Sequence, residues 1–239
     1  MLIGISRVRD EALIIADTLR HYLRLCDRIL IYDDASTDDT ADIADGFDRV
    51  TVTRGNEWCL DRTAEETRHR HILLEQARSM GAEWCLCFDA DERLVGELPG
   101  LTADGYRFRL FDGYLTEDRQ ALYRGGDLAE LPRMWGPEYR DILVLFKTSL
   151  ATYSGLDRRE PIFKAATAHS GAFIKHFGKC LSAEHWSETC HYYATYWPEP
   201  YKSKWAARRG KAVHVQSDFG RRLFTWERLM NSQSEWVKL

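Results

Sequence analysis

Residues 28–40 read Arg-Ile-Leu-Ile-Tyr-Asp-Asp-Ala-Ser-Thr-Asp-Asp-Thr. The run begins as a short apolar, β-branched stretch, which predicts a buried parallel strand. It stops at acidic residues, and we expect Ser36 or Thr37 to cap the helix that follows. A helix start favours acids in its first turn. That preference does not explain Asp33 and Asp34, because they precede the capping residue.

Strands and helices alternate on both sides of this stretch. The sequence predicts strands at 2–5, 50–53 and 83–88, and helices around 15–23 and from Asp61 to about Met80. This alternation is typical of a mainly parallel sheet flanked by helices, an α/β fold. Such sheets bind ligands beyond the carboxyl ends of their strands.

The rest of the chain is less regular. We expect strands at 106–111, 143–147 and 171–177, a long loop region over 112–140, and a helical, aromatic C-terminal end from about Ser182. The loop region is where we expect an acceptor site to be shaped.

Composition narrows the class of protein. The chain has 239 residues, is 44% hydrophobic and carries a net charge of -4, which fits one α/β domain without a coat of positive charge. Six cysteines without a C-x-x-C pair predict buried free thiols rather than a zinc site. The N-terminus is too charged for a signal peptide and no stretch is long enough to span a membrane. We therefore expect a cytoplasmic protein, with attachment to a membrane surface as the open alternative.

Acids also follow the strand predicted at 83–88. Asp89 and Asp91 lie two apart, so in an extended segment their carboxylates face one side. Together they would repel each other, and a divalent cation relieves this repulsion. Mg²⁺ and Mn²⁺ take one or two protein carboxylates together with substrate phosphates. The pair therefore predicts a metal–diphosphate site, while a solvated acidic turn remains the alternative.

These motifs, with the turn after the first strand, resemble family 2 glycosyltransferases. The N-terminal match is carried by Ser6-Arg-Val-Arg-Asp-Glu-Ala12, Leu19-Arg-His-Tyr22 and residues 27–40, with Asp10 in place of the family's usual Asn. Trp84-Cys-Leu-Cys-Phe-Asp-Ala-Asp-Glu-Arg-Leu94 matches the family's DxDE motif, and His191-Tyr-Tyr, Tyr201-Lys-Ser-Lys204 and Arg209-Gly match its C-terminal HY…K..RG motif more loosely. The resemblance covers 1–94 well and 170–212 in part.

The resemblance implies a single GT-A (Rossmann-like) domain over 1–239. Its parts would be a nucleotide-sugar-binding half (1–94), an acceptor-side half (95–181) and a helical C-terminal extension (182–239). It also implies a nucleoside diphosphate sugar donor, for which we expect a UDP-sugar, Mn²⁺ or Mg²⁺, and transfer with inversion.

Site residues follow from the same resemblance. Asp33 and Asp34 would bind the nucleoside, and Asp89 and Asp91 would serve ribose and metal, with His176 or His191 as a further metal ligand. The remaining expected donor-binding residues are Ser6, Arg7, Arg9, Glu11, Arg68, Lys204, Arg208 and Arg209.

The catalytic base is the carboxylate that removes the acceptor's proton. Related enzymes carry it between the DxD and C-terminal motifs, where this chain has Asp157 and Glu160. Asp141 and Glu138 are rival candidates.

The acceptor stays open. Residues 202–228 contain eight basic and two acidic side chains, a net charge of +6, with aromatic residues between them. This pattern fits a glycan or lipid-linked sugar at a membrane surface, or hydroxymethylated bases in DNA. A basic helical end that closes over the donor is the remaining interpretation.

Three other functions are less well supported. A phosphatase with an aspartate nucleophile would need its D-x-D after the first strand. A nucleotidyltransferase would need a Gly-rich loop there, and residues 6–11 contain no glycine. A non-catalytic nucleotide-sugar-binding module does not account for the intact acids at 33, 34, 89 and 91.

Overall fold

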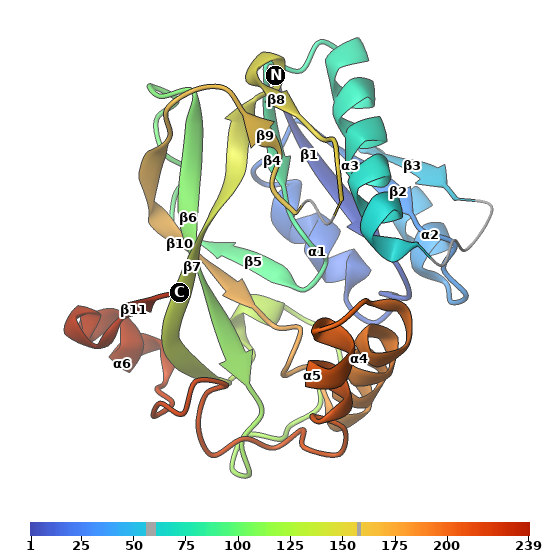
Figure 1. Ribbon diagram of the computed structural model, residues 1–239. Helices are drawn as coiled ribbons and strands as arrows, with labels where there is room; N and C mark the ends of the chain where they lie inside the picture. The colour runs from blue at the N-terminus through green and yellow to red at the C-terminus, as the bar shows by residue number, and fades with distance from the viewer. Residues whose placement is uncertain (56–60, 157–158) are drawn as a thin grey trace. The chain divides into compact units, whose positions relative to one another are not determined.

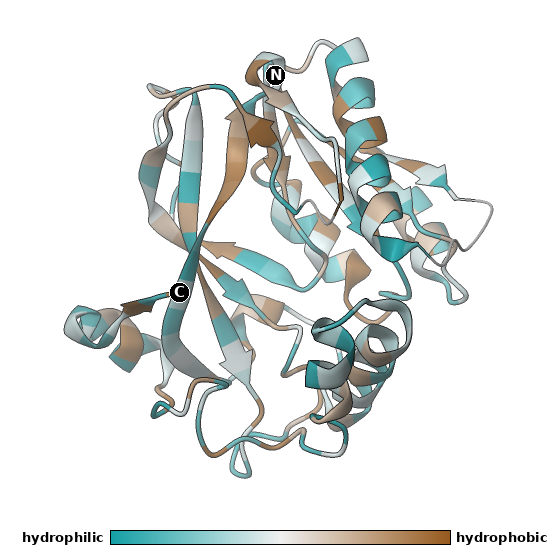
Figure 2. Cartoon of the chain, in the orientation of Figure 1, coloured by the Kyte–Doolittle hydropathy of each residue, from teal (hydrophilic) through white to brown (hydrophobic). Residues whose placement is uncertain are grey.

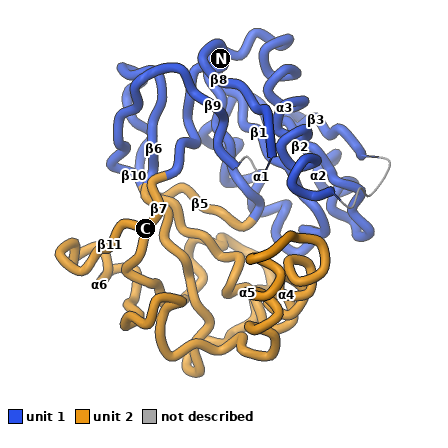
Figure 3. Tube along the Cα trace, in the orientation of Figure 1, with its two compact units in different colours: residues 1–90, 96–108, 142–172 blue, residues 91–95, 109–141, 173–239 orange. Residues whose placement is uncertain are grey.

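The computed structural model describes residues 1–55, 61–156 and 159–239. They form two compact units (Figure 3). Unit 1 comprises 1–90, 96–108 and 142–172, and unit 2 comprises 91–95, 109–141 and 173–239. The boundary falls inside the D-x-D motif, so Asp89 belongs to unit 1 and Asp91 to unit 2.

Unit 1 contains four neighbouring parallel strands of the sheet (Figure 1). Its adjacent parallel strands are, in order, β3 (Val50–Arg54), β2 (Arg28–Asp33), β1 (Leu2–Val8) and β4 (Trp84–Cys87). The connecting helices are α1 (Ile15–Tyr22), α2 (Thr40–Asp45) and α3 (Arg62–Ser79). The predicted α/β fold, a mainly parallel sheet flanked by helices, is confirmed by this order.

Helix α3 has the predicted limits. Asp61 caps its start, because the Asp61 side chain accepts a hydrogen bond from the Ala64 amide at 3.3 Å. Gly81, with φ of 78°, follows its end. The helix packs on β1 and β2, and its ribbon alternates hydrophilic and hydrophobic residues (Figure 2). Leu73 and Leu74 lie on its buried face, in the core of unit 1.

The predicted cap of α2 is wrong. The helix begins at Thr40, and in the described part of the chain Asp39 precedes it without a capping side-chain bond. The Ser36 hydroxyl accepts instead from the Asp10 amide at 3.0 Å, and the Thr37 amide donates to the Asp10 carboxylate at 2.6 Å. Ser36 and Thr37 thus contact a distant loop, and the Thr40 amide at the start of the helix donates to the Asp38 carboxylate at 3.0 Å.

The strands that follow run through both units. The sheet order continues from β4 through β7 (Met134–Lys147), β6 (Gly105–Tyr114) and β10 (Ala168–His176) to β5 (Glu92–Val95). In unit 1, β7 pairs antiparallel with β4, and in unit 2 β10 pairs antiparallel with β5. The loop predicted over 112–140 is wrong at both ends, where β6 and β7 continue. Gly136 and Pro137 argue against a strand locally, but β7 continues through them and pairs just beyond them, at Glu138 and Tyr139, with β11 (Val237–Lys238).

The C-terminal helices are α4 (Ala183–Tyr196), α5 (Tyr201–Ala206) and α6 (Trp226–Asn231), with a non-helical stretch at 207–225. The short elements are η1 (Leu128–Glu130), η2 (Thr148–Leu150), η3 (Gln233–Glu235), β8 (Ala151–Thr152) and β9 (Ile162–Phe163). None of the helices in the described residues is long and apolar enough to cross a bilayer. The five described cysteines are buried and free, as predicted, whereas Cys59 lies outside the described residues.

Candidate functional site

In unit 1 the polar residues that follow three neighbouring strands meet at one edge of the sheet. Because β1, β2 and β4 are parallel, their carboxyl ends share an edge, and Val8 pairs with Asp33 in the register of β1 and β2. Asp34 follows β2 directly, and Asp89 lies two residues beyond β4. The edge predicted from the sequence is therefore formed.

Asp34 is enclosed by cations. Its carboxylate is 1% exposed and accepts from Arg7 at 2.5 Å and from Arg62. Arg9 donates to the Asp34 carbonyl oxygen at 2.7 Å. The arginines at the end of β1 thus bind Asp34, the first residue after β2. Arg62 was not singled out from the sequence, because nothing local separates it from the other arginines of α3.

Asp33 has a different environment. Its side chain is buried, and Oδ2 accepts from the Ser36 amide at 3.2 Å. Its Oδ1 and the buried Ser6 hydroxyl have no hydrogen-bond partner among the residues that the structure describes. A buried acceptor without a donor is costly, and such groups in folded proteins call for a specific explanation. A bound ligand that donates to them is one such explanation.

Ion pairs connect the carboxyl end of β1 to the D-x-D motif through α3. Arg7 contacts Glu66 at 3.1 Å, and Arg70 lies 3.6 Å from Glu66 and 3.2 Å from Asp89. Arg159 contacts the same carboxylate, Asp89, at 3.0 Å. Two guanidinium groups thus flank Asp89. Arg159 comes from the segment in which the sequence places the base, but it was not predicted as a site residue.

His69, another residue that the sequence did not point out, stacks on Tyr32 with ring centroids 3.8 Å apart. Burial and the nearby Arg7 and Arg68 guanidinium groups lower the pKa of His69 to about 3. The imidazole is therefore neutral at physiological pH. Its side chain lies 3.7 Å from the Asp34 carboxylate.

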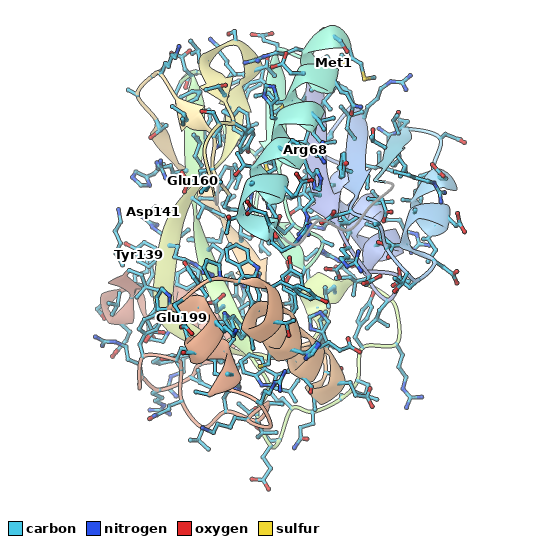
Figure 4. All side chains as sticks on the ribbon, turned by 45° about the vertical axis from the view of Figure 1, so that its right-hand side comes forward. Met1, Arg68, Tyr139, Asp141, Glu160 and Glu199 are labelled. Atoms are coloured by element: carbon cyan, nitrogen blue, oxygen red, sulfur yellow. The ribbon has the colours of Figure 1, made fainter. Side chains whose placement is uncertain are left out.

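Two further predicted residues of unit 1 have other contacts. Arg68 projects from α3 (Figure 4) and pairs with Glu65 at 2.5 Å. The Glu11 backbone amide donates to the Thr40 hydroxyl at 2.7 Å, which fixes the loop after β1 against α2. Their expected roles toward a donor stay predictions.

The base candidates lie in separate environments. Asp157 lies outside the described residues. Glu160, in unit 1, pairs with Arg107 at 3.0 Å. The rivals belong to β7 in unit 2, where Asp141 (Figure 4) pairs with Lys238 at 2.7 Å and Glu138 accepts from the Ser217 hydroxyl at 2.8 Å.

In unit 2 His176 lies between two carboxylates. Its Nε2 is 3.2 Å from Asp91, and its Nδ1 is 2.6 Å from Asp112. Burial opposes a charge on the ring, but the two carboxylates outweigh it and raise the pKa of His176 to about 10. Burial likewise opposes the charge on Asp91, and His176 outweighs it, so that the pKa of Asp91 falls to about 2. The His176 ring is therefore protonated at physiological pH, with one nitrogen toward Asp91 and the other toward Asp112.

A divalent cation would take the place of the His176 Nε2 proton beside Asp91, since metal binding to histidine releases a proton. A metal-bound histidine ordinarily donates its second ring N–H to a carboxylate, as His176 Nδ1 is placed to do toward Asp112. Gly178 keeps the other side open, since a Cβ there would collide with an Asp91 oxygen and lie 2.9 Å from His176 Nε2. Within residues 1–55, 61–156 and 159–239, no three His, Cys, Asp or Glu side chains gather as a complete metal site. Substrate phosphates would have to supply the other ligands.

Asp112 also belongs to a buried network of ion pairs. Lys179 contacts Asp112 at 2.9 Å and Asp218 at 2.7 Å, and Arg208 contacts Asp218 at 3.0 Å. Burial and the proximity of Arg208 and Lys179 lower the pKa of Lys204, which places this predicted residue near the same cationic group. Asp112 and Lys179 were not predicted as site residues, because their roles depend on contacts across distant sequence.

His191, the other predicted metal ligand, lies beside Arg209, with His191 Nδ1 2.8 Å from the guanidinium group. Both residues line a shallow surface pocket of about 410 Å³ together with Ser187 and Glu188. Of the two predicted histidine ligands, His176 is therefore the one that contacts Asp91.

No protein-family model matches the chain, and no curated protein matches its sequence. Among solved structures, a 4-diphosphocytidyl-2C-methyl-D-erythritol synthase is similar, with 16% identity and a TM-score of 0.40 over 63% of this chain and 76% of the other. A mannose-1-phosphate geranyltransferase from Thermus thermophilus shows 11% identity and a TM-score of 0.34 over 92% and 70%. Values this low carry no conclusion about a reaction. The strands and helices themselves define an α/β fold, a mainly parallel sheet flanked by helices.

Proposed function

We propose that the chain is a metal-dependent glycosyltransferase that moves a sugar from a nucleoside diphosphate sugar, a UDP-sugar, to an acceptor hydroxyl with inversion. The buried, unsatisfied oxygen of Asp33 carries the proposal, together with the Ser6 hydroxyl, within the part of the chain that the structure describes. Both lie toward the sheet edge where α/β folds bind ligands. A nucleoside offers N–H and O–H donors for such acceptors.

The metal side of the proposal rests on Asp91 and His176. They would hold Mn²⁺ or Mg²⁺, with Asp112 orienting the imidazole. The cation would offset the charge on the departing nucleoside diphosphate. Asp89, two residues before Asp91, is held by Arg70 and Arg159 and would serve the ribose.

The proposal is tested by thermal unfolding with UDP and Mn²⁺. A ligand that binds only the folded state at 100 times its Kd stabilises it by about 2.7 kcal/mol, which raises Tm measurably. UDP with EDTA and AMP with Mn²⁺ are the matched controls. If UDP with Mn²⁺ leaves Tm where these controls leave it, the proposal fails.

Asp33→Asn is expected to weaken UDP binding about 10- to 100-fold, because hydrogen bonds to a charged acceptor contribute about 1.5–3 kcal/mol. The fold should keep its stability, since the described residues give Oδ1 no partner to lose. Isothermal titration with UDP measures the first effect and thermal unfolding without ligand the second. Unchanged UDP affinity would remove the main support for the nucleoside site.

Replacement of the base is expected to lower kcat about 100-fold or more while UDP-sugar binding stays unchanged, because general-base catalysis contributes about 10²–10⁴-fold. Glu160→Gln and Asp157→Asn are the two variants, and Arg107→Gln controls for loss of the Glu160 ion pair. Steady-state kinetics with saturating donor compares kcat of the two carboxylate variants with kcat of Arg107→Gln. Full turnover in both carboxylate variants would reject both residues as the base.

A further inference from the structure

Residues 209–222, here called the 209–222 loop, connect α5 to α6 (Figure 1) and expose three apolar side chains. Val213 is 43% exposed, Val215 is 92% exposed and Phe219 is 54% exposed. Lys211, Val213 and Val215 alternate with less exposed residues, as in an extended segment that turns one face to solvent. Single exposed apolar residues are ordinary, but three in one short loop require an explanation.

The exposure is built into the fold of unit 2. Val213 forms a β-bridge with Leu115, and the His214 amide donates to the Leu115 carbonyl at 2.8 Å. The Ser217 amide donates to the Arg221 carbonyl at 2.8 Å, closing a turn that presents Phe219. The backbone on either side of the apolar tips is thus fixed, with Val215 and Phe219 directed outward.

The same loop carries four exposed cations. Arg209, Lys211, Arg221 and Arg222 are exposed, and the one acid of the loop, Asp218, is paired with Lys179 and Arg208 in the interior of unit 2. The loop therefore combines exposed cations with exposed apolar side chains, and of the cations Arg221 also lies 3.6 Å from Glu138. That combination matches a surface with anionic groups outside and hydrocarbon just beneath them.

We propose that the 209–222 loop docks on an anionic lipid bilayer, with Val213, Val215 and Phe219 entering the interface and the four cations contacting headgroup phosphates. Nucleic acid fits less well, because single strands are held by aromatic rings that stack on bases, and two of the three tips are aliphatic. The contact is a property of the loop and does not depend on the transfer reaction. It would bring the protein to acceptors that are attached to a membrane.

The test is flotation of the full chain with vesicles of phosphatidylcholine alone or mixed with phosphatidylglycerol, without nucleotide or metal. The wild type should float only with the anionic vesicles. Val215→Asp/Phe219→Asp should weaken this binding by more than about tenfold, because it replaces two exposed apolar side chains with negative charges. Lys211→Ser/Arg222→Ser should weaken it about 25-fold, since each cation near an anionic surface contributes about fivefold.

Leu101→Asp, at an exposed apolar side chain outside the loop with 47% exposure, is the matched control and should bind like the wild type. The inference is overturned if the wild type does not float with anionic vesicles, or if Val215→Asp/Phe219→Asp floats as well as Leu101→Asp. It is also overturned if the protein binds a DNA oligonucleotide more tightly than it binds the anionic vesicles, and if Val215→Asp/Phe219→Asp binds that DNA as well as the wild type does. None of these results affects UDP-dependent stabilisation, so they are distinguishable from failure of the proposed function.

Discussion

Asp91→Asn is expected to abolish Mn²⁺-dependent binding of a UDP-sugar and to lower kcat/KM about 1,000-fold, while the fold stays intact. The amide keeps the shape of the side chain but removes the charge that a hard cation requires. A bound metal contributes several kcal/mol to stabilising the leaving group, which corresponds to about three powers of ten in rate. Titration of Mn²⁺ in the presence of UDP, followed by kinetics, measures both effects.

Variants of neighbouring residues are expected to lower Mn²⁺ affinity by different amounts. His176→Ala should resemble Asp91→Asn, whereas Asp112→Asn should weaken Mn²⁺ binding only about 10- to 100-fold, because it acts through the orientation of His176. Asp118→Asn is the control, since Asp118 is a well-exposed acid of the same unit. Equal Mn²⁺ affinity in Asp91→Asn, His176→Ala and Asp118→Asn would place the cation elsewhere.

Asp34→Ala is expected to destabilise the protein by about 3–5 kcal/mol, because removing one member of a buried ion pair leaves charge that is no longer compensated. Asp34 is 1% exposed and accepts from both Arg7 and Arg62, of which Arg62 is itself buried. Tm should fall by about 10 °C, since a protein of this size loses roughly 2–4 °C per kcal/mol. Thermal unfolding followed by circular dichroism measures this change.

The comparison variant is Asp42→Ala. Asp42 pairs with Arg54 at 2.8 Å, but this pair is on the surface, where ion pairs contribute little. Its Tm should therefore stay near that of the wild type. A fall in Asp34→Ala no larger than in Asp42→Ala would show that the Arg7–Asp34–Arg62 cluster is not a stabilising element.

The adjacent acids Asp33 and Asp34 have different environments. From the sequence, Asp33 and Asp34 were expected to share one role toward the nucleoside. In the structure the Asp34 carboxylate is occupied by guanidinium groups, whereas Asp33 retains a buried oxygen without a donor among the described residues. The strand end they mark was predictable because it depends on a local change from apolar to acidic residues. The different environments of Asp33 and Asp34 were not predictable, because Arg62 reaches Asp34 from a helix that is distant in the sequence.

The sequence by itself determined the features that depend on near neighbours: the apolar runs of β1, β2 and β4, the start of α3 at its Asp61 cap, and the acids at the ends of successive parallel strands. Only the tertiary structure decided that β7 extends through Gly136 and Pro137, that Asp112 faces His176, and that Arg159 flanks Asp89. The physical reason is that periodicity and capping act over a few residues. Hydrogen bonds and ion pairs of the site join side chains far apart in the sequence, and their energy exists only once the chain has folded.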